Sequence, residues 1–521
     1  MKMNSKWMRG LAIGLSSTLV ATTLYFSVPK APTTPVESAP VVIADAATKT
    51  TVPKYIFLFI GDGMSYPQIQ AAADYYGKDA KDSVSVVQNT SDPSYSPKSN
   101  PLSFMKFPVA GSAQTYDATS FAPDSASTAT SILTGKKTHS GTINMDISKT
   151  KKFVTIAEKL KKQKNYKIGV VTTVNLNHAT PAAAYAHQAS RKNNYEIGEE
   201  LVKSNFEYFA GGALMEPTGK NNDKTSIYDL AKKAGYTVAT TQAEASKLNS
   251  KTKKAIVVAE TLADGNAMSY ENDRASSEWA LKNYVKKGID VMGTKNGFFM
   301  LVEGGKIDWA CHANDAGSSI SDTKALSDAV QEAVKFYNKH PKETLIIVTG
   351  DHETGGLTIG YSGTNYDTYL DNLQNQKISY AKFDSEYVAN YKKNNTPFET
   401  VLSDIQKNFG LVTEANKAST KNQRLVLTDY EYNLLKAAYD KTIKGEKSSN
   451  QEEYILYGSY EPLTVTITHL LNNKSGISFT SYSHTGLPVP VFAKGLGQSQ
   501  FEGYYDNTDI YNKLAKLTKV K

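Results

Sequence analysis

Two short motifs place acids and imidazoles at spacings that suit metal binding. In VEGGKIDWACHAND, residues 302–315, Asp308 and His312 are four residues apart, so one helical turn would present both on the same face. In TGDHETGG, Asp351 and His352 are adjacent and can converge on one site only if the chain turns there. Mixed histidine and carboxylate ligands suit zinc, whereas carboxylates with hydroxyls suit magnesium.

Three more candidates lie beside apolar runs that could form buried strands. Asp62 follows YIFLFI, Glu303 ends GFFMLVE, and His484 lies in SYSHTGLPVPVF. Alone, such an acid is usually a turn former or a helix cap, and such a histidine is usually packed. Together, seven acids and imidazoles at one sheet edge would repel one another or lack solvation without a cation. The set therefore predicts a metal centre.

The candidate nucleophile is Ser125, in APDSASTATSILTG. A serine that begins a helix has amides and a dipole directed toward an incoming anion. The alternative is a helix N-cap, which is the usual role of a serine in this position. The chain carries no G-x-S-x-G elbow and no Ser-His-Asp signature, so a metal ion would have to activate the hydroxyl.

The elements that would position these residues follow one pattern. Apolar runs such as YIFLFI, KIGVVTT, GFFMLVEGG and TLIIVTG each lead into a polar loop, and a helical spacing of apolar residues separates the last two. This order predicts an α/β fold with a mostly parallel central sheet flanked by helices, and with ligands at the carboxyl ends of the strands.

Composition restricts the class of protein. The 521 residues are 40% hydrophobic with a formal net charge of +8, carried by Lys-rich stretches without arginine–aromatic interleaving, which favours solvated faces over nucleic-acid recognition. Residues 1–46 comprise a basic start, an apolar run and a Pro/Thr/Ser linker, which predicts a signal peptide or a retained membrane anchor. We therefore expect an exported protein, in the periplasm, outside the cell or attached to its surface.

Six stretches, in order along the chain, resemble those of the alkaline phosphatases: FIGDGMS, PDSASTAT, HATPAAAYAHQASR, VEGGKIDWACH, TGDHETGG and SHTG. The resemblance runs from about Tyr55 to about Gly497. It implies a catalytic domain made of residues 50–354 and 481–521. Residues 355–480, rich in Tyr, Asn and Lys, would then be an insertion that forms a crown or a dimer-interface region.

The resemblance also implies a role for each site residue. Ser125 would become phosphorylated, Arg191 would grip phosphate oxygens, and His178 and Trp309 would border the substrate at positions where some bacterial members carry Asp and Lys. The implied metal ligands fall into three groups: Asp308, His312 and His484 for one zinc; Asp62, Asp351 and His352 for a second zinc; and Asp62, Thr180 and Glu303 for one magnesium.

The activity that the resemblance implies is hydrolysis of phosphate monoesters through a phosphoserine, by a homodimer acting on small molecules. A phosphodiesterase or sulfatase on the same scaffold is one alternative, and a non-catalytic surface protein that binds phosphate or metal is another. The only cysteine, Cys311, lies between two implied ligands but at no ligand position, and on a helical turn it would point roughly 100° away from His312. We interpret it as a bystander.

Overall fold

The computed structural model describes residues 52–77, 85–92, 95 and 97–521. The predicted signal or anchor segment, residues 1–46, lies outside the described residues. The described part of the chain falls within one compact unit, Thr51–Lys521. None of the helices described there combines the length and the apolar character that crossing a bilayer requires.

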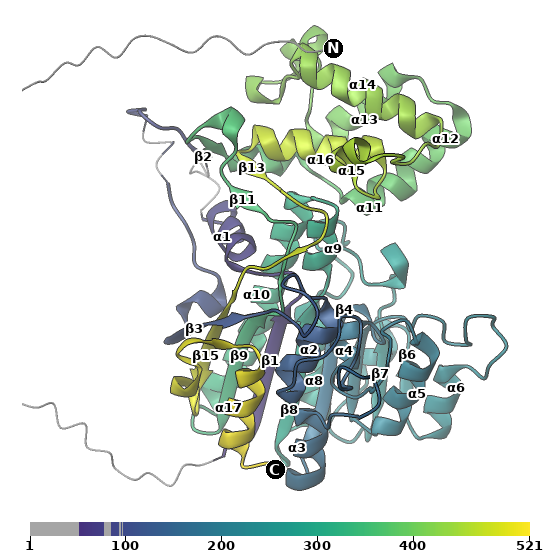
Figure 1. Ribbon diagram of the computed structural model, residues 1–521, viewed down its shortest axis with the longest axis vertical. Helices are drawn as coiled ribbons and strands as arrows, with labels where there is room; N and C mark the ends of the chain where they lie inside the picture. The colour runs from purple at the N-terminus through teal and green to yellow at the C-terminus, as the bar shows by residue number, and fades with distance from the viewer. Residues whose placement is uncertain (1–51, 78–84, 93–94, 96) are drawn as a thin grey trace, which may run out of the picture. The chain divides into compact units, whose positions relative to one another are not determined.

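A ten-stranded sheet forms the centre of the fold (Figure 1). The seven strands from β9 to β6 run parallel, whereas β15 is antiparallel to both β9 and β3. This arrangement confirms the predicted mostly parallel α/β sheet. In spatial order the strands are β16 (Gly503–Asp506), β3 (Val109–Gln114), β15 (Val489–Gly495), β9 (Thr344–Gly350), β1 (Tyr55–Gly61), β8 (Phe298–Gly304), β4 (Lys167–Asn175), β5 (Tyr208–Gly212), β7 (Ala255–Val258) and β6 (Thr237–Ala239).

Helices cover both faces of this sheet, which is why its central strands read as continuous apolar runs. In β1, Phe57 and Phe59 pack into one core, and the alternating residues Ile56 and Leu58 pack into the other. The first core includes residues of α1 (Tyr66–Tyr75), α7 (Gln242–Ser246), α8 (Leu281–Met292), α9 (Lys306–His312) and α10 (Ala316–Lys339). The second includes residues of α2 (Ser125–Thr134), α3 (Ile156–Lys164), α4 (Ala179–Ala182), α5 (Asn194–Ser204), α6 (Ile227–Lys233) and α17 (Thr508–Thr518).

Strand register brings the predicted metal ligands to one edge of the sheet. Gly61 at the end of β1 is paired with Gly350 at the end of β9, so Asp62 and Asp351, each one residue further on, leave the sheet side by side. On the other side of β1, Ile60 is paired with Glu303 of β8. The turn after Asp62 needs Gly63, whose φ is +69° and whose added Cβ would lie 2.9 Å from the Cα of Asp308.

The region 355–480 is mainly helical and is drawn at the top of Figure 1. Short strand pairs join its two ends: β10 (Glu353–Thr354) with β14 (His484–Thr485), and β11 (Thr358–Ile359) with β13 (Ile477–Ser478). After this region the chain returns to the edge of the central sheet, where β14 carries His484. Its helices are α11 (Tyr380–Phe383), α12 (Ala389–Asn394), α13 (Phe398–Phe409), α14 (Asp429–Ile443), α15 (Gln451–Tyr457) and α16 (Pro462–Lys474), and β12 (Thr368–Tyr369) pairs with β2 (Ser85–Val86).

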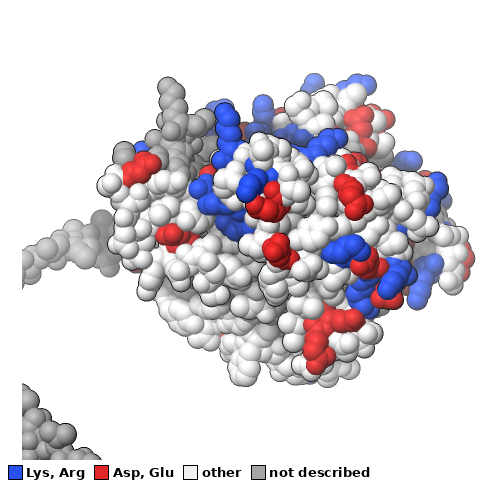
Figure 2. Space-filling view, turned by 90° about the horizontal axis from the view of Figure 1, so that it is seen from above, with Lys and Arg blue, Asp and Glu red and all other residues white. Residues whose placement is uncertain are grey.

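Figure 2 shows the molecule from above, with lysine and arginine side chains interspersed among aspartates and glutamates. In the helical region 355–480, Lys392 forms an ion pair with Glu461 and Lys441 forms one with Glu453. Surface pairs of this kind contribute little to stability, but they spread the charge over the surface.

Candidate metal centre

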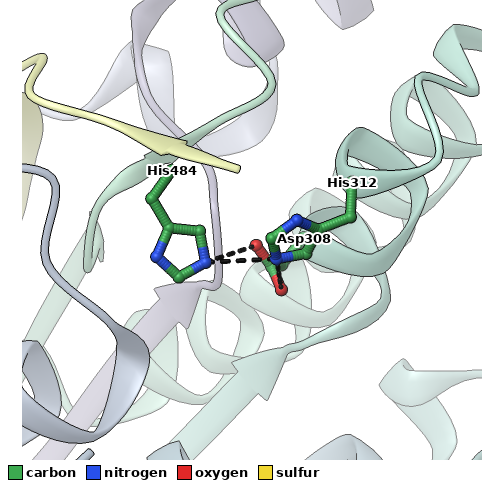
Figure 3. Close-up of side chains that lie close together, drawn as sticks. All are labelled: Asp308, His312 and His484. Carbon is green, nitrogen blue, oxygen red and sulfur yellow. Dashed lines mark hydrogen bonds and ion pairs between the residues drawn. The ribbon is translucent and has the colours of Figure 1, made fainter. Parts of the chain in front are cut away.

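The first cluster joins two residues of α9 with one residue of β14 (Figure 3). His312 Nε2 lies 3.3 Å from Asp308 Oδ2, and His484 Nε2 lies 3.6 Å from Asp308 Oδ1. The Nδ1 atoms of both rings are held by backbone carbonyls, His312 by that of Tyr482 at 2.6 Å and His484 by that of Pro123 at 2.5 Å. An Nδ1–H that donates to a carbonyl leaves the Nε2 lone pair free, as in metal-binding histidines.

The two free lone pairs of this cluster face each other. His312 Nε2 and His484 Nε2 are only 3.1 Å apart, so without a cation they must share a proton. Burial disfavours the charged ring, but the carboxylate of Asp308 outweighs it and raises the pKa of His312 to about 9. The pocket between the three side chains therefore favours positive charge.

The second cluster, Asp62, Asp351 and His352, is entirely buried. His352 Nε2 lies 3.4 Å from Asp62 Oδ1 and 3.3 Å from Asp351 Oδ2. Burial, followed by the charge of Asp308, raises the pKa of Asp351 to about 8. Burial and the charge of Asp351 raise the pKa of Asp62 as well. A bound cation would favour the ionised form of both carboxyls.

The third cluster contains Asp62, Glu303 and His178, which sequence reasoning had assigned to the substrate side of the site. Glu303 Oε1 and His178 Nδ1 are buried without a hydrogen-bond partner among the residues that the structure describes. Burial raises the pKa of Glu303 to about 7. Thr180, the third predicted magnesium ligand, donates through Oγ1 to Asp62 Oδ2 at 3.3 Å. Buried polar atoms without a protein partner need another one, and an ion or a water would supply it.

The candidate nucleophile lies at the second cluster. Ser125 is the first residue of α2 and is 1% exposed, and the N-cap is Asp124, whose side chain accepts from the backbone amide of Ser127 at 3.1 Å. Ser125 is thus not needed as a cap. Its Oγ lies 3.2 Å from His352 Nε2 and 3.4 Å from Asp62 Oδ1.

The guanidinium of Arg191 lies between two partners. Nη1 donates to Asp124 Oδ2 at 2.9 Å, and Nη2 lies 3.1 Å from His178 Nε2. Burial opposes ionisation of Asp124, but Arg191 and the amide of Gly141 lower its pKa to about 2. The ring of Trp309 meets that of His178 edge-on, with centroids 5.9 Å apart.

Sequence reasoning missed two residues that hold this site together. Asp124 orients Arg191 across 67 residues of chain, and its only sequence signal is its place directly before Ser125. Thr354 donates through Oγ1 to Asp308 Oδ1 at 2.5 Å, and its signal is its place within TGDHETGG.

Cys311 lies outside all three clusters, with its Sγ buried 3.2 Å from Ser319 Oγ. Its Sγ contacts Ser319 of α10 and Gln68 of α1. The geometry therefore agrees with its interpretation as a bystander.

Comparison with known proteins adds a second line of evidence. The family profile described as alkaline phosphatase matches residues 53–520. Alkaline phosphatase 4 of Bacillus subtilis is 31% identical over 473 residues, which is 89% of this chain and 88% of that protein.

Two solved structures show the same fold. The alkaline phosphatase of Thermus thermophilus has a TM-score of 0.71 at 20% identity and covers 93% of this chain and 96% of its own. A variant of the enzyme from the Antarctic bacterium TAB5, with Mg bound in a site called M3, has a TM-score of 0.59 at 24% identity and covers 91% of this chain and 100% of its own.

Proposed function

The chain belongs to the alkaline phosphatase family and is a phosphomonoesterase, and on that premise we propose that it works through Ser125 with divalent cations in its three clusters. The observation that carries the proposal is the position of Ser125, whose Oγ lies within hydrogen-bond distance of His352 at the second cluster. The proposal includes zinc in the first two clusters and magnesium in the third.

The donor sets fit these ions. The first cluster offers two imidazole nitrogens and a carboxylate, and the second offers one imidazole and two carboxylates, which are zinc ligands. The third adds the free Oε1 of Glu303 and the hydroxyl of Thr180, which are oxygen ligands of the kind magnesium prefers. When bound, the cations would supply positive charge that lowers the pKa of the Ser125 hydroxyl and offsets the charge of phosphate.

The residues of the chain would then act in order. Ser125 Oγ attacks phosphorus, and the bond from phosphorus to the ester oxygen breaks, so the alcohol leaves and a phosphoserine remains. Water attacks the phosphoserine and releases phosphate and the free serine. In-line displacement puts the leaving oxygen opposite Ser125. Arg191 would donate to the remaining phosphate oxygens.

A direct test is hydrolysis of a chromogenic phosphate monoester by the purified protein, with its metal content measured by elemental analysis. The proposal expects turnover that chelation abolishes and zinc with magnesium restores. A higher turnover of a matched phosphodiester or sulfate ester would favour the alternative activities on this scaffold.

The organisation of the protein around the site is proposed in the same way. We propose that 355–480 is an insertion in a catalytic domain of residues 50–354 and 481–521, that the chain is exported, and that it forms a homodimer. The mass in solution and the N-terminal sequence of the exported protein test the last two statements.

A further inference from the structure

Lys306, the first residue of α9, is a buried cation beside the site. Its side chain is 0% exposed. Within the described residues its Nζ has no hydrogen-bond acceptor, and the nearest carboxylate oxygen, Asp264 Oδ2, is 3.5 Å away. Removing an ammonium from water is unfavourable unless the fold supplies other partners.

The ion pair with Asp264 and two aromatic rings supply them. Lys306 Nζ lies 3.8 Å from the ring centroid of Tyr270 and 4.5 Å from that of Trp309. Both distances are within the range of a favourable cation–π contact, which is strongest for desolvated cations and for tryptophan. The ammonium therefore holds one side of the Trp309 indole.

Other contacts of Trp309 lead to His178, which lies beside Arg191. The turn η3 (Asp264–Asn266) packs on the indole, because a Cβ added to Gly265 would lie 3.4 Å from its ring. Asn175 at the end of β4 donates to the Gly265 carbonyl at 2.9 Å and accepts from the His178 amide at 2.9 Å. The indole thus contacts Lys306, η3 and the ring of His178.

We propose that Lys306 is a positioning residue, whose buried ammonium fixes the Trp309 indole against His178 and thereby sets the position of His178 beside Arg191. His178 Nε2 is 3.1 Å from Arg191 Nη2, so a shift of the imidazole moves a contact of the guanidinium. The inference rests on the proposed role of Arg191 in binding phosphate. Among the described residues Lys306 contacts neither Arg191 nor Ser125, and the contact with Trp309 is the route that we propose for its effect.

The test compares Lys306→Met, which removes the charge, with Lys306→Arg, which keeps it. Lys335→Met, at a 61% exposed lysine of α10, is the matched control. For the zinc- and magnesium-loaded protein we expect Lys306→Met to raise the inhibition constant of inorganic phosphate about five-fold, a size typical of residues that act through a neighbour. Lys306→Arg and Lys335→Met should stay within about two-fold of the original protein.

Tryptophan fluorescence gives a readout that is independent of activity. Lys306→Met should change the emission spectrum, and the change should vanish in a Trp309→Leu background, which leaves Trp279 in place. In the Trp309→Leu background, Lys306→Met should also leave the inhibition constant of inorganic phosphate unchanged. Equal losses with and without Trp309, or an unchanged phosphate constant in Lys306→Met, would overturn the proposal.

Should Lys306→Met fail to fold, Trp309→Leu tests the proposed path from Trp309 to the phosphate site. This variant keeps Lys306 and should raise the inhibition constant of inorganic phosphate by a similar factor. An unchanged inhibition constant would refute the proposed path. If the original protein failed to hydrolyse phosphate esters, the proposed function would fail, whereas the fluorescence comparison would still report whether Lys306 acts on Trp309.

Discussion

His178 Nε2 and Arg191 Nη2 are 3.1 Å apart, and only one of these two atoms can accept a hydrogen bond. A guanidinium only donates, so Nε2 must accept, and the proton of the neutral ring then lies on Nδ1. Burial and Arg191 lower the pKa of His178 to about 3, which keeps the ring neutral. A neutral imidazole has one lone pair, so His178 cannot accept from Arg191 while Nδ1 binds an ion of the third cluster.

The first prediction concerns the competition between Arg191 and a bound ion for the lone pair of His178. If magnesium in the third cluster takes His178 Nδ1 as a ligand beside the oxygens of Asp62, Glu303 and Thr180, it should release Arg191 from His178. Adding magnesium to zinc-loaded protein should then tighten phosphate binding by about five-fold, a typical coupling between two sites. The measurement is the inhibition constant of phosphate against magnesium concentration. In His178→Ala the dependence should disappear, and a dependence of the same size in that variant would contradict the prediction.

The second prediction concerns the nucleophile. Ser125→Ala should abolish trapping of labelled phosphate on the protein and leave the fold intact, because its Oγ contacts only candidate ligands. Ser131→Ala is the matched control, since Ser131 is a buried serine of the same helix whose Oγ donates only to the Ser127 carbonyl. The control should retain the label. Label that persists in Ser125→Ala would assign the nucleophile elsewhere.

The third prediction concerns Arg191. Arg191→Ala should raise the phosphate inhibition constant roughly ten- to hundred-fold, because a charge-assisted bidentate contact contributes about 1.5–3 kcal/mol. Arg424→Ala is a fair control, since Arg424 is paired with Asp371 at 3.0 Å much as Arg191 is paired with Asp124. Equal inhibition constants in both variants would place Arg191 outside the phosphate site.

Much of this site could be predicted from the sequence because its ligands follow unambiguous strands. The run that forms β1 is apolar at every position, so its end at Gly61 and the exit of Asp62 were clear. The position of His178 could not be predicted from the sequence, because it depends on how the turn after β4 packs against Arg191 and Trp309. Hydrophobic periodicity is weak in the short strands β3 and β16 and in the helices of 355–480. These elements depend on tertiary contacts for their form.

The fourth prediction concerns metal removal and pH. The pKa of Glu303 is raised to about 7 and that of Asp351 to about 8, so these two carboxyls bind more protons in the folded metal-free protein than in the unfolded chain between about pH 4 and pH 8. Their contribution to the stability of the metal-free protein should therefore fall as pH rises through this window. Zinc and magnesium should remove most of the fall, because bound cations stabilise the ionised carboxylates and bind only the folded state.

Thermal melting of metal-free and reloaded protein from pH 5 to pH 9 measures this effect. The difference in Tm between the two forms should grow with pH. A difference that is constant or that shrinks toward pH 9 would show that these carboxyls do not control stability.

The last prediction concerns Cys311, which lies one residue before His312. Its Sγ is 3.2 Å from Ser319 Oγ and 3.8 Å from Gln68 Nε2, inside the contact between α9, α10 and α1, and burial raises the pKa of the thiol. A thiolate ligand would instead be ionised by the metal. Cys311→Ser should therefore keep its zinc content and most of its activity, with a stability loss of about 1 kcal/mol for the smaller, more polar side chain. The native protein should also react with a thiol reagent only after unfolding. Loss of one zinc per chain together with activity in Cys311→Ser would make Cys311 a ligand.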